Sequence, residues 1–229
     1  MGLSYVKMSG VTLRRMSACL AAITSALVSV ATMLAVAPAA SADPCSDIKV
    51  IFARGTDDTP GLGRVGDAFS ATLSGLIGGR SLTTYGVNYP ASYDFLAAAD
   101  GANDAAFYIA DLVKQCPSTK IVLGGYSQGA AVVDMLAGIP PLGNKVGEIG
   151  SAPPLDPTLV PAIKAVAVFG NPSAKFSIPI TSSVFGGRAI DICKDGDPIC
   201  SRGRNPFAHS DYVSAGLTNQ GASFVAGLV

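Results

Sequence analysis

The sequence has no tryptophan, a single histidine and few charged residues. Only 14% of the 229 residues are charged, and 16 basic side chains balance 16 acidic ones. A chain without an excess of positive charge has no electrostatic footprint for nucleic acid, and no strong field to recruit an anionic membrane as its main partner. Nucleic-acid binding is therefore excluded. Any imidazole chemistry must use the one histidine, His209.

Charged residues are absent altogether between residues 16 and 42. Three basic residues precede this apolar stretch, and it ends in Ala40-Ser41-Ala42. A basic start, an apolar middle and a small-residue end are the three parts of a secretory signal peptide. We predict a signal peptide over residues 1–42 and a secreted chain over residues 43–229, extracellular or associated with the cell wall. Because the apolar stretch approaches bilayer-spanning length, an uncleaved N-terminal anchor is the alternative.

Four cysteines remain after the predicted cleavage: Cys45, Cys116, Cys193 and Cys200. An even number of cysteines in an exported chain favours disulfides, here two bridges out of three possible pairings. Zinc ligation is the alternative, but zinc-binding cysteines usually lie two to four residues apart and are often joined by histidine. These four are widely spread, and the histidine has no cysteine near it. We therefore predict two disulfides, no metal ion and no other cofactor.

Short, β-branched apolar runs alternate with helical patterns along residues 43–229. This alternation is typical of a parallel sheet covered by helices on both faces. The apolar spacing predicts strands over residues 48–53, 82–87, 120–126, 163–169 and 188–192. It predicts helices over residues 64–77, 102–114 and 128–137, with further helix toward the end of the chain. The sequence thus indicates one α/β domain, in which the Gly- and Pro-rich residues 142–161 form a surface connection.

The segment Gly125-Tyr126-Ser127-Gln128-Gly129 lies between a predicted strand and a predicted helix. This is the context of the GxSxG nucleophile elbow, in which a serine occupies a tight turn with strained backbone angles. Glycines two residues to either side leave room for the chain to pass. The motif favours Ser127 as a nucleophile. An ordinary strand-to-helix turn is the alternative in a chain with 26 glycines.

A serine nucleophile needs a base and an acid, and in α/β-hydrolases the chain order is serine, acid, histidine. Five aspartates lie between Ser127 and His209: Asp134, Asp156, Asp191, Asp195 and Asp197. The first three fall in a helix, a Pro-rich loop and a strand, where a triad acid is not expected. Asp195 and Asp197 lie in the small loop that a bridge between Cys193 and Cys200 would close. The residues alone leave the choice between these two open.

Four parts of the chain carry a further pattern: Phe52-Ala53-Arg54-Gly55-Thr56, Gly124-Gly125-Tyr126-Ser127-Gln128-Gly129, Cys193-Lys194-Asp195-Gly196-Asp197-Pro198-Ile199-Cys200, and His209. On these segments the sequence resembles the cutinase family of serine esterases, most closely the cutinase-like proteins secreted by mycobacteria. The resemblance spans nearly all of residues 43–229. It implies a compact α/β-hydrolase with a central five-stranded parallel sheet flanked by helices and no large lid.

The resemblance also implies roles for individual residues. Its CxxxDxxC segment selects Asp197 over Asp195. Asp197 would then complete a catalytic triad with Ser127 and His209. It implies the disulfides Cys45–Cys116 and Cys193–Cys200. The oxyanion hole would consist of the backbone N–H groups of Thr56 and Gln128, with the Thr56 hydroxyl as a further candidate donor. The residue after the nucleophile is also the general expectation for one such donor.

The expected reaction is the hydrolysis of carboxylic esters through an acyl-enzyme, with short to medium acyl chains and lipids as candidate substrates. The loops over residues 89–95 and 202–207 rim the cleft in cutinases, and their aromatic residues are candidates to bind an acyl chain: Tyr89, Tyr93, Phe95 and Phe207. The expected partners are the ester substrate and, transiently, a lipid or cell-envelope surface. Two alternatives keep the fold: a catalytically silent antigen or lipid-binding module, and an acyltransferase with a sugar acceptor.

Overall fold

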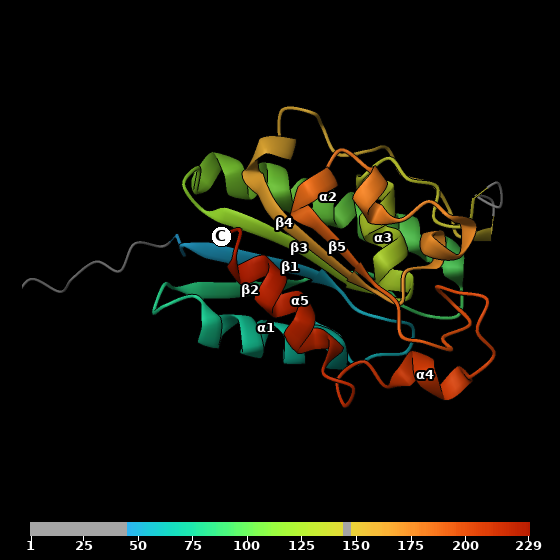
Figure 1. Cartoon of the computed structure of the whole chain (residues 1–229). Helices are drawn as coiled ribbons and strands as arrows, with labels where there is room; N and C mark the ends of the chain where they lie inside the picture. Colours follow the sequence, from blue (N-terminus) through green and yellow to red (C-terminus); the bar gives the residue numbers. More distant parts are fainter. Residues whose placement is uncertain (1–44, 144–147) are drawn as a thin grey trace, which may run out of the picture. The chain divides into compact units, whose positions relative to one another are not determined.

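Five parallel strands form one sheet in the part of the chain that the computed structural model describes, residues 45–143 and 148–229 (Figure 1). In chain order they are β1 Ile48–Ala53, β2 Leu82–Gly86, β3 Lys120–Tyr126, β4 Ile163–Phe169 and β5 Ala189–Ile192. Every neighbouring pair is parallel, and the order across the sheet is β2-β1-β3-β4-β5. This confirms the predicted five-stranded sheet. The predicted signal peptide lies outside the described residues.

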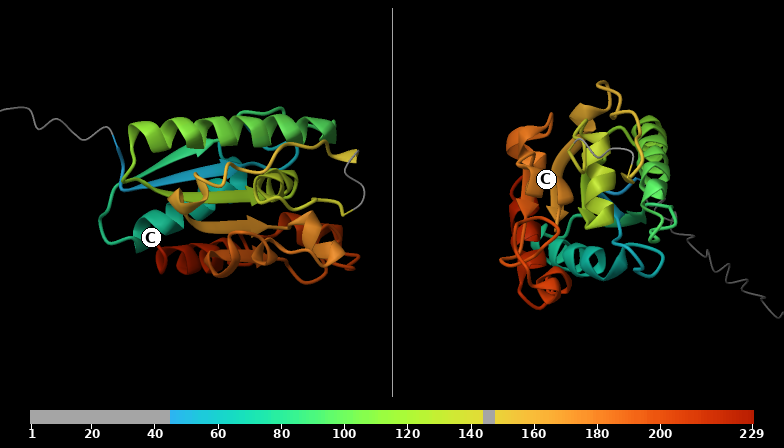
Figure 2. Two further views of the ribbon diagram at one scale, coloured as in Figure 1. Left: turned by 90° about the horizontal axis from the view of Figure 1, so that it is seen from above. Right: turned by 90° about the vertical axis from the view of Figure 1, so that its right-hand side faces the viewer.

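Helices cover both faces of this sheet (Figures 1 and 2). The α-helices of the described residues are α1 Gly63–Leu76, α2 Ala98–Gln115, α3 Gln128–Leu136, α4 Pro206–Ser210 and α5 Leu217–Ala226. Helices α1 and α5 pack side by side on one face, and α2 and α3 pack on the other. Short 3-10 helices occupy Phe95–Ala97, Val160–Ala162, Pro172–Phe176, Ile180–Ser182 and Gly186–Arg188. Within the described ranges, no helix combines the length and the apolar character needed to cross a bilayer.

Helix α2 begins at Ala98, earlier than the predicted start at residue 102. A glycine weakens helical propensity, and Gly101 makes the first turns a poor helix signal in the sequence. In the fold, however, a Cβ atom at Gly101 would lie 3.0 Å from both the Tyr89 ring and the Val132 side chain. The glycine therefore allows α2 to pack closely against α3, and this tertiary contact outweighs the local propensity.

The three central strands, β1, β3 and β4, are buried on both faces, which explains why they appear in the sequence as continuous apolar runs. Alternate residues of β1 belong to different cores, because successive side chains of a strand point to opposite faces. Ile51 packs in the core beneath α2 and α3, while Val50 and Phe52 pack in the core beneath α1 and α5. In the second core, the rings of Phe52, Phe69 and Phe169 lie 5.8 to 6.4 Å apart. Burial of one such side chain stabilises the fold by roughly 1.5–3 kcal/mol.

A buried carboxyl group, Asp134 on α3, and a half-buried one, Asp191 on β5, share one amide. Asn171 Nδ2 donates hydrogen bonds to Asp134 Oδ1 at 3.1 Å and to Asp191 Oδ2 at 2.9 Å. Burial raises the pKa of Asp134 well above its usual value, although a hydrogen bond from Asn171 acts against this, and the Asp191 carboxyl raises the pKa further. Burial also raises the pKa of Asp191. Among the described residues, neither carboxyl forms an ion pair with a basic side chain.

An Asp134→Asn variant should be more stable than the wild type at alkaline pH. The amide keeps an acceptor for Asn171 and removes the cost of burying a charge, which we expect to be worth on the order of 1–3 kcal/mol. The folded state holds the Asp134 proton more tightly than the unfolded state does. In the wild type, the stability contributed by protonated Asp134 is therefore full below about pH 4 and is lost as the pH rises through the folded-state pKa. Urea unfolding at acidic and alkaline pH measures the effect.

The exposed Asp67 on α1 supplies the matched control for this prediction. Asp67→Asn also removes one carboxyl group, but from a solvated position, so the difference between acidic and alkaline pH should be absent. An equal change in the free energy of unfolding at both pH values in Asp134→Asn would contradict a raised pKa at that position.

The topology determines where a ligand can bind. From β1 the chain moves to β2 on one side and then crosses to β3 on the other side, so the switch point lies between β1 and β3. In open α/β sheets, ligands bind outside the carboxyl ends of the strands at such a point. The segments that follow Ala53 and Tyr126 are therefore the ones that border the expected site.

Candidate active site

Ser127 occupies the tight turn between β3 and α3. Its backbone angles, φ 55° and ψ −116°, lie in a region that L-residues rarely adopt. A Cβ atom at Gly125 would overlap the Gly129 carbonyl, and one at Gly129 would overlap the Ala53 carbonyl. The Ser127 N–H donates to Phe169 O at 2.9 Å, which fixes the turn to β4. Only glycines at these two positions allow the serine to stand at the carboxyl edge of the sheet.

His209 is held opposite this serine by α4 and by an aromatic ring. The Asn205 side chain caps α4 by accepting a hydrogen bond from the Phe207 N–H. The ring of Tyr126 stacks on the imidazole with the ring centroids 5.1 Å apart, and its hydroxyl donates to the backbone carbonyl of His209. In this position His209 Nε2 lies 2.8 Å from Ser127 Oγ.

Asp197 lies behind the imidazole in the loop closed by the Cys193–Cys200 disulfide. Its side chain is fully buried, and its Oδ2 atom lies 2.8 Å from His209 Nδ1. Burial would raise the pKa of this carboxyl, but hydrogen bonds from His209, Tyr212 and the Ile199 N–H hold the pKa below its usual value. The carboxylate therefore stays charged beside the ring.

The structure thus brings together the three residues of the predicted triad. The other candidate acids lie elsewhere: Asp195 is exposed, Asp156 is exposed in its loop, and Asp134 and Asp191 bind Asn171. A hydroxyl, an imidazole and a carboxylate in one hydrogen-bonded chain is the arrangement that nucleophilic acyl transfer requires.

Both predicted disulfide pairings are confirmed. Cys45 is bonded to Cys116, and Cys193 is bonded to Cys200. Among the described residues, no group of three or more His, Cys, Asp or Glu side chains is arranged to hold a metal ion.

Thr56 and Gln128 border Ser127 from the ends of β1 and β3. Within residues 45–143 and 148–229, neither backbone N–H donates to a protein acceptor, so both are free to bind an anion. The Thr56 hydroxyl, named above as a further donor, instead donates to Gln128 Oε1 at 3.3 Å. The hydroxyl thus orients the Gln128 side chain, and the two backbone groups are left as the donors at this edge.

A buried arginine holds the loop that carries Thr56. Arg54 is only 7% exposed, and its Nη2 atom donates to Tyr89 O at 2.7 Å and to Pro90 O at 3.1 Å. Its Nε atom donates to Asp58 O at 3.1 Å. These bonds tie the loop after β1 to the loop after β2. They hold Thr56 in place although the next residue has a positive φ of 63°.

Tyr89 belongs to this structural contact and does not line the cleft, contrary to the prediction. Its side chain is 5% exposed, its ring packs under the Arg54 guanidinium, and its hydroxyl donates to Arg54 O. The sequence placed it correctly in the loop after β2 but could not show that its side chain turns inward.

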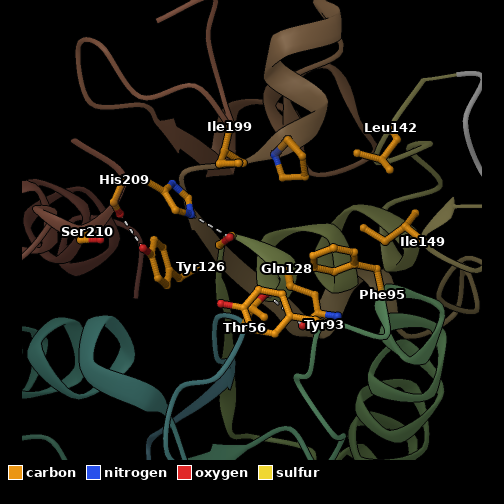
Figure 3. Close-up of a pocket in the computed structure, with 12 residues that line it drawn as sticks. Thr56, Tyr93, Phe95, Tyr126, Gln128, Leu142, Ile149, Ile199, His209 and Ser210 are labelled. Atoms are coloured by element: carbon orange, nitrogen blue, oxygen red, sulfur yellow. Dashed lines mark hydrogen bonds between the residues drawn. The ribbon is translucent and has the colours of Figure 1, made fainter. Parts of the chain in front are cut away.

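An apolar cleft of about 480 Å³ extends from the serine, within the usual range for small-molecule sites. His209 and Tyr126 lie on one side of it, and Phe95, Leu142 and Ile149 lie on the other (Figure 3). The cleft is lined by Thr56, Tyr93, Phe95, Tyr126, Ser127, Gln128, Leu142, Ile149, Pro172, Ile199, His209 and Ser210. This places Phe95 and Tyr93 where the sequence predicted them.

The prediction for Phe207 needs correction. Its side chain is 81% exposed and borders a separate depression with Lys194 and Asp195, beyond the cleft. Conversely, Leu142 and Ile149 were missed, because the Gly- and Pro-rich connection in which they lie shows no apolar periodicity. Tyr212 was also missed: it is fully buried and donates to Asp197 Oδ2 at 2.7 Å.

Comparison with known proteins identifies the family of this chain. Residues 44–229 match the sequence profile of the family described as Cutinase. Phospholipase Culp4 of Mycobacterium tuberculosis is 48% identical over 212 residues, covering 90% of each chain. Carboxylesterase Culp1 of the same species is 44% identical over 197 residues, covering 82% of this chain and 84% of the relative.

Two solved structures share the fold. A Trichoderma reesei cutinase in complex with a C11Y4 phosphonate inhibitor has a TM-score of 0.65 and 35% identity, covering 81% of this chain and 78% of the other. An acetylxylan esterase solved at 0.90 Å has a TM-score of 0.69 and 26% identity, covering 80% and 99% of the two chains. By sequence and by fold, this chain belongs to the cutinase family of carboxylic ester hydrolases.

Proposed function

We propose that this protein is a secreted serine esterase that cleaves carboxylic esters through an acyl-enzyme formed on Ser127. One observation carries the proposal: the hydrogen-bonded chain from Ser127 Oγ to His209 Nε2 and from His209 Nδ1 to Asp197 Oδ2, each step 2.8 Å. The first distance lies within the range for direct proton transfer between a nucleophile and its base, and the second lets the carboxylate orient that base.

In this mechanism His209 takes the proton of the Ser127 hydroxyl while the oxygen attacks the ester carbonyl. Asp197 holds the ring in the tautomer that accepts the proton at Nε2, and it stabilises the imidazolium that forms. The imidazolium then gives its proton to the departing alcohol, which leaves the acyl group on Ser127. A water molecule, deprotonated by the same imidazole, releases the acid and restores the serine.

The negative charge that develops on the carbonyl oxygen would be met by the N–H groups of Thr56 and Gln128. Their lack of protein acceptors in the described residues supports this role. Gln128 is also the first residue of α3, and the dipole of this helix favours an anion at its N-terminus. Donors of this kind are each worth on the order of 10²- to 10³-fold in turnover.

The cleft favours apolar acyl groups of short to medium length. Its far end is formed by Phe95, Leu142 and Ile149, and among the described residues that line the cleft none but His209 is a basic or acidic side chain. At the surface, Tyr93 and Phe207 are 75% and 81% exposed and could contact a lipid or cell-envelope surface transiently. The relatives' names, a phospholipase and a carboxylesterase, support lipid and simple esters as the substrate classes to test.

Covalent labelling with an alkyl fluorophosphonate tests the proposal. Attack by Ser127 Oγ forms a bond to phosphorus and releases fluoride, with the serine proton passing to His209. We expect one adduct per chain, on the peptide that contains Ser127, and none after the protein is unfolded. Failure to label the folded protein, or labelling at another serine, would contradict the proposal. A folded protein that takes up no label would favour the catalytically silent alternative.

A chain-length series of p-nitrophenyl esters then defines the substrate. We expect kcat/KM to be highest for short to medium acyl chains, because the apolar cleft is limited to about 480 Å³. Product analysis in the presence of trehalose distinguishes hydrolysis from acyl transfer, since a transferase would give the acylated sugar in place of the free acid.

A further inference from the structure

We propose that Tyr212 is a positioning residue of this site: its phenol shares one oxygen of the Asp197 carboxylate with His209 and sets how readily the imidazole takes up a proton. The inference rests on the proposed function for its catalytic meaning. Its physical content concerns the protonation of His209, which can be measured without any substrate.

The phenol group of Tyr212 lies at the centre of a buried hydrogen-bond network. Its hydroxyl donates to Asp197 Oδ2 at 2.7 Å, the same atom that lies 2.8 Å from His209 Nδ1. The hydroxyl also accepts a hydrogen bond from the Lys194 N–H at 3.1 Å and lies 3.4 Å from Cys200 Sγ. Lys194, Asp197 and Cys200 all belong to the disulfide-closed loop, so Tyr212 contacts this loop at three places.

The phenol can act only as a donor toward Asp197. Burial raises the pKa of Tyr212 far above its usual value, and the hydrogen bond to Asp197 raises it further. The hydroxyl therefore remains protonated over the whole working range of an esterase. Since the Lys194 N–H can only donate and the ionised Asp197 carboxylate can only accept, the hydroxyl hydrogen is directed at Asp197 Oδ2.

Two donors on one carboxylate oxygen divide its negative charge. A hydrogen bond from Tyr212 stabilises the carboxylate by itself and so weakens the attraction between Asp197 and an imidazolium at His209. Removal of the phenol should concentrate the charge on the bond to His209. The imidazolium would then form at a higher pH, while the carboxylate would lose one of the three hydrogen bonds that fix its orientation.

The phenol carries no charge, so its removal takes away none of the other charged or titratable groups near the pair. Tyr126 on β3 stacks on the ring, and Arg64 on α1 donates to the carbonyl of Ser210, next to the histidine. On the loop side, Lys194 pairs with Asp211 at 3.0 Å, and Lys175 donates to the carbonyl of Pro198. A change in His209 protonation in a Tyr212 variant is therefore assigned to the lost phenol.

The experiment uses the fact that His209 is the only histidine of the chain. In protein labelled with ¹⁵N-histidine, every imidazole signal belongs to this residue, so its titration can be followed by NMR without assignment. We expect Tyr212→Phe to move the titration midpoint upward by about 0.5–1 pH unit. The acidic limb of the kcat/KM profile should move with it, and the plateau value of kcat should fall about tenfold.

Tyr108→Phe is the matched control, because Tyr108 also loses a hydroxyl while its ring stays packed, there against Tyr85 on the α2 side of the sheet. It should leave the midpoint unchanged. If Tyr212→Phe folds poorly, site-specific replacement of Tyr212 by 3-fluorotyrosine keeps the hydroxyl and strengthens it as a donor, so the midpoint should move downward.

An unchanged midpoint in Tyr212→Phe would overturn the inference, even if the variant were less active, because a purely structural role lowers activity without changing His209 protonation. A failed proposed function is distinguishable: the fluorophosphonate would then not label Ser127 in the wild type, whatever the NMR titration shows.

Discussion

A Ser127→Ala variant should lose about 10⁶-fold of its ester-hydrolysis rate and keep its fold. The loss is this large because the acyl-enzyme cannot form, and the base and oxyanion donors then have no attacking oxygen to assist. The backbone turn should survive, since alanine meets the same positive φ as serine and the N–H bond to Phe169 O is retained. We expect the free energy of unfolding to change by less than about 1 kcal/mol.

The measurements are kcat for p-nitrophenyl butyrate and urea unfolding of both proteins. Ser70→Ala is the matched control, because Ser70 is a buried serine whose hydroxyl has no hydrogen-bond partner among the described residues. It should keep full activity. If Ser127→Ala kept a rate within a hundredfold of the wild type, the hydrolysis measured would have to come from another nucleophile.

The centre of the sheet could be predicted closely because its three middle strands are buried on both faces. Strands β1, β3 and β4 begin and end where their apolar runs do, at Ile48–Ala53, Lys120–Tyr126 and Ile163–Phe169. Helix ends were less predictable. The start of α2 depends on how Gly101 packs against Tyr89 and Val132, two residues far away in the sequence, and local patterns carry no information on such contacts.

A residue of the site could be predicted when it belonged to a motif or was the only one of its type in the sequence. Ser127 follows from the elbow motif and His209 from being the only imidazole. The acid needed the family resemblance, because Asp195 and Asp197 share one small loop. Which carboxyl group turns inward depends on the loop backbone: Asp195 is exposed, while Asp197 is fully buried.

The residues whose hydrogen bonds fix the loop and the carboxylate of the site could not be predicted from the sequence. Arg54 was noticed only as part of a motif, and Tyr212 was not singled out at all. The function of each depends on tertiary contacts: Arg54 binds carbonyls of the loop after β2, and Tyr212 reaches Asp197, 15 residues earlier in the chain. Such roles become visible only when the hydrogen bonds of the folded chain are known.

The second large effect is expected for Asp197→Asn, which should lower kcat by about 10⁴-fold. An amide has one acceptor atom and one donor group where the carboxylate has two acceptors. If its NH₂ group faces the His209 side, it opposes the donors of His209 and Tyr212. If the NH₂ group faces the other side, it opposes the Ile199 N–H, which donates to Oδ1 at 2.8 Å. Either orientation sets donor against donor, and the charge that stabilises the imidazolium is gone.

Asp195→Asn is the control within the same disulfide-closed loop, and this variant should keep its activity because the Asp195 side chain is exposed.

The free energy of unfolding of Asp197→Asn gives a second test. Because hydrogen bonds hold the folded-state pKa of Asp197 below its usual value, this carboxylate stabilises the fold above the unfolded-state pKa, and the contribution is lost as the pH falls through the folded-state value. Asp197→Asn should therefore be less stable than the wild type at neutral pH, and the difference should shrink toward acidic pH. A variant that kept kcat within tenfold, or whose loss of stability was the same at every pH, would remove Asp197 from the role of triad acid.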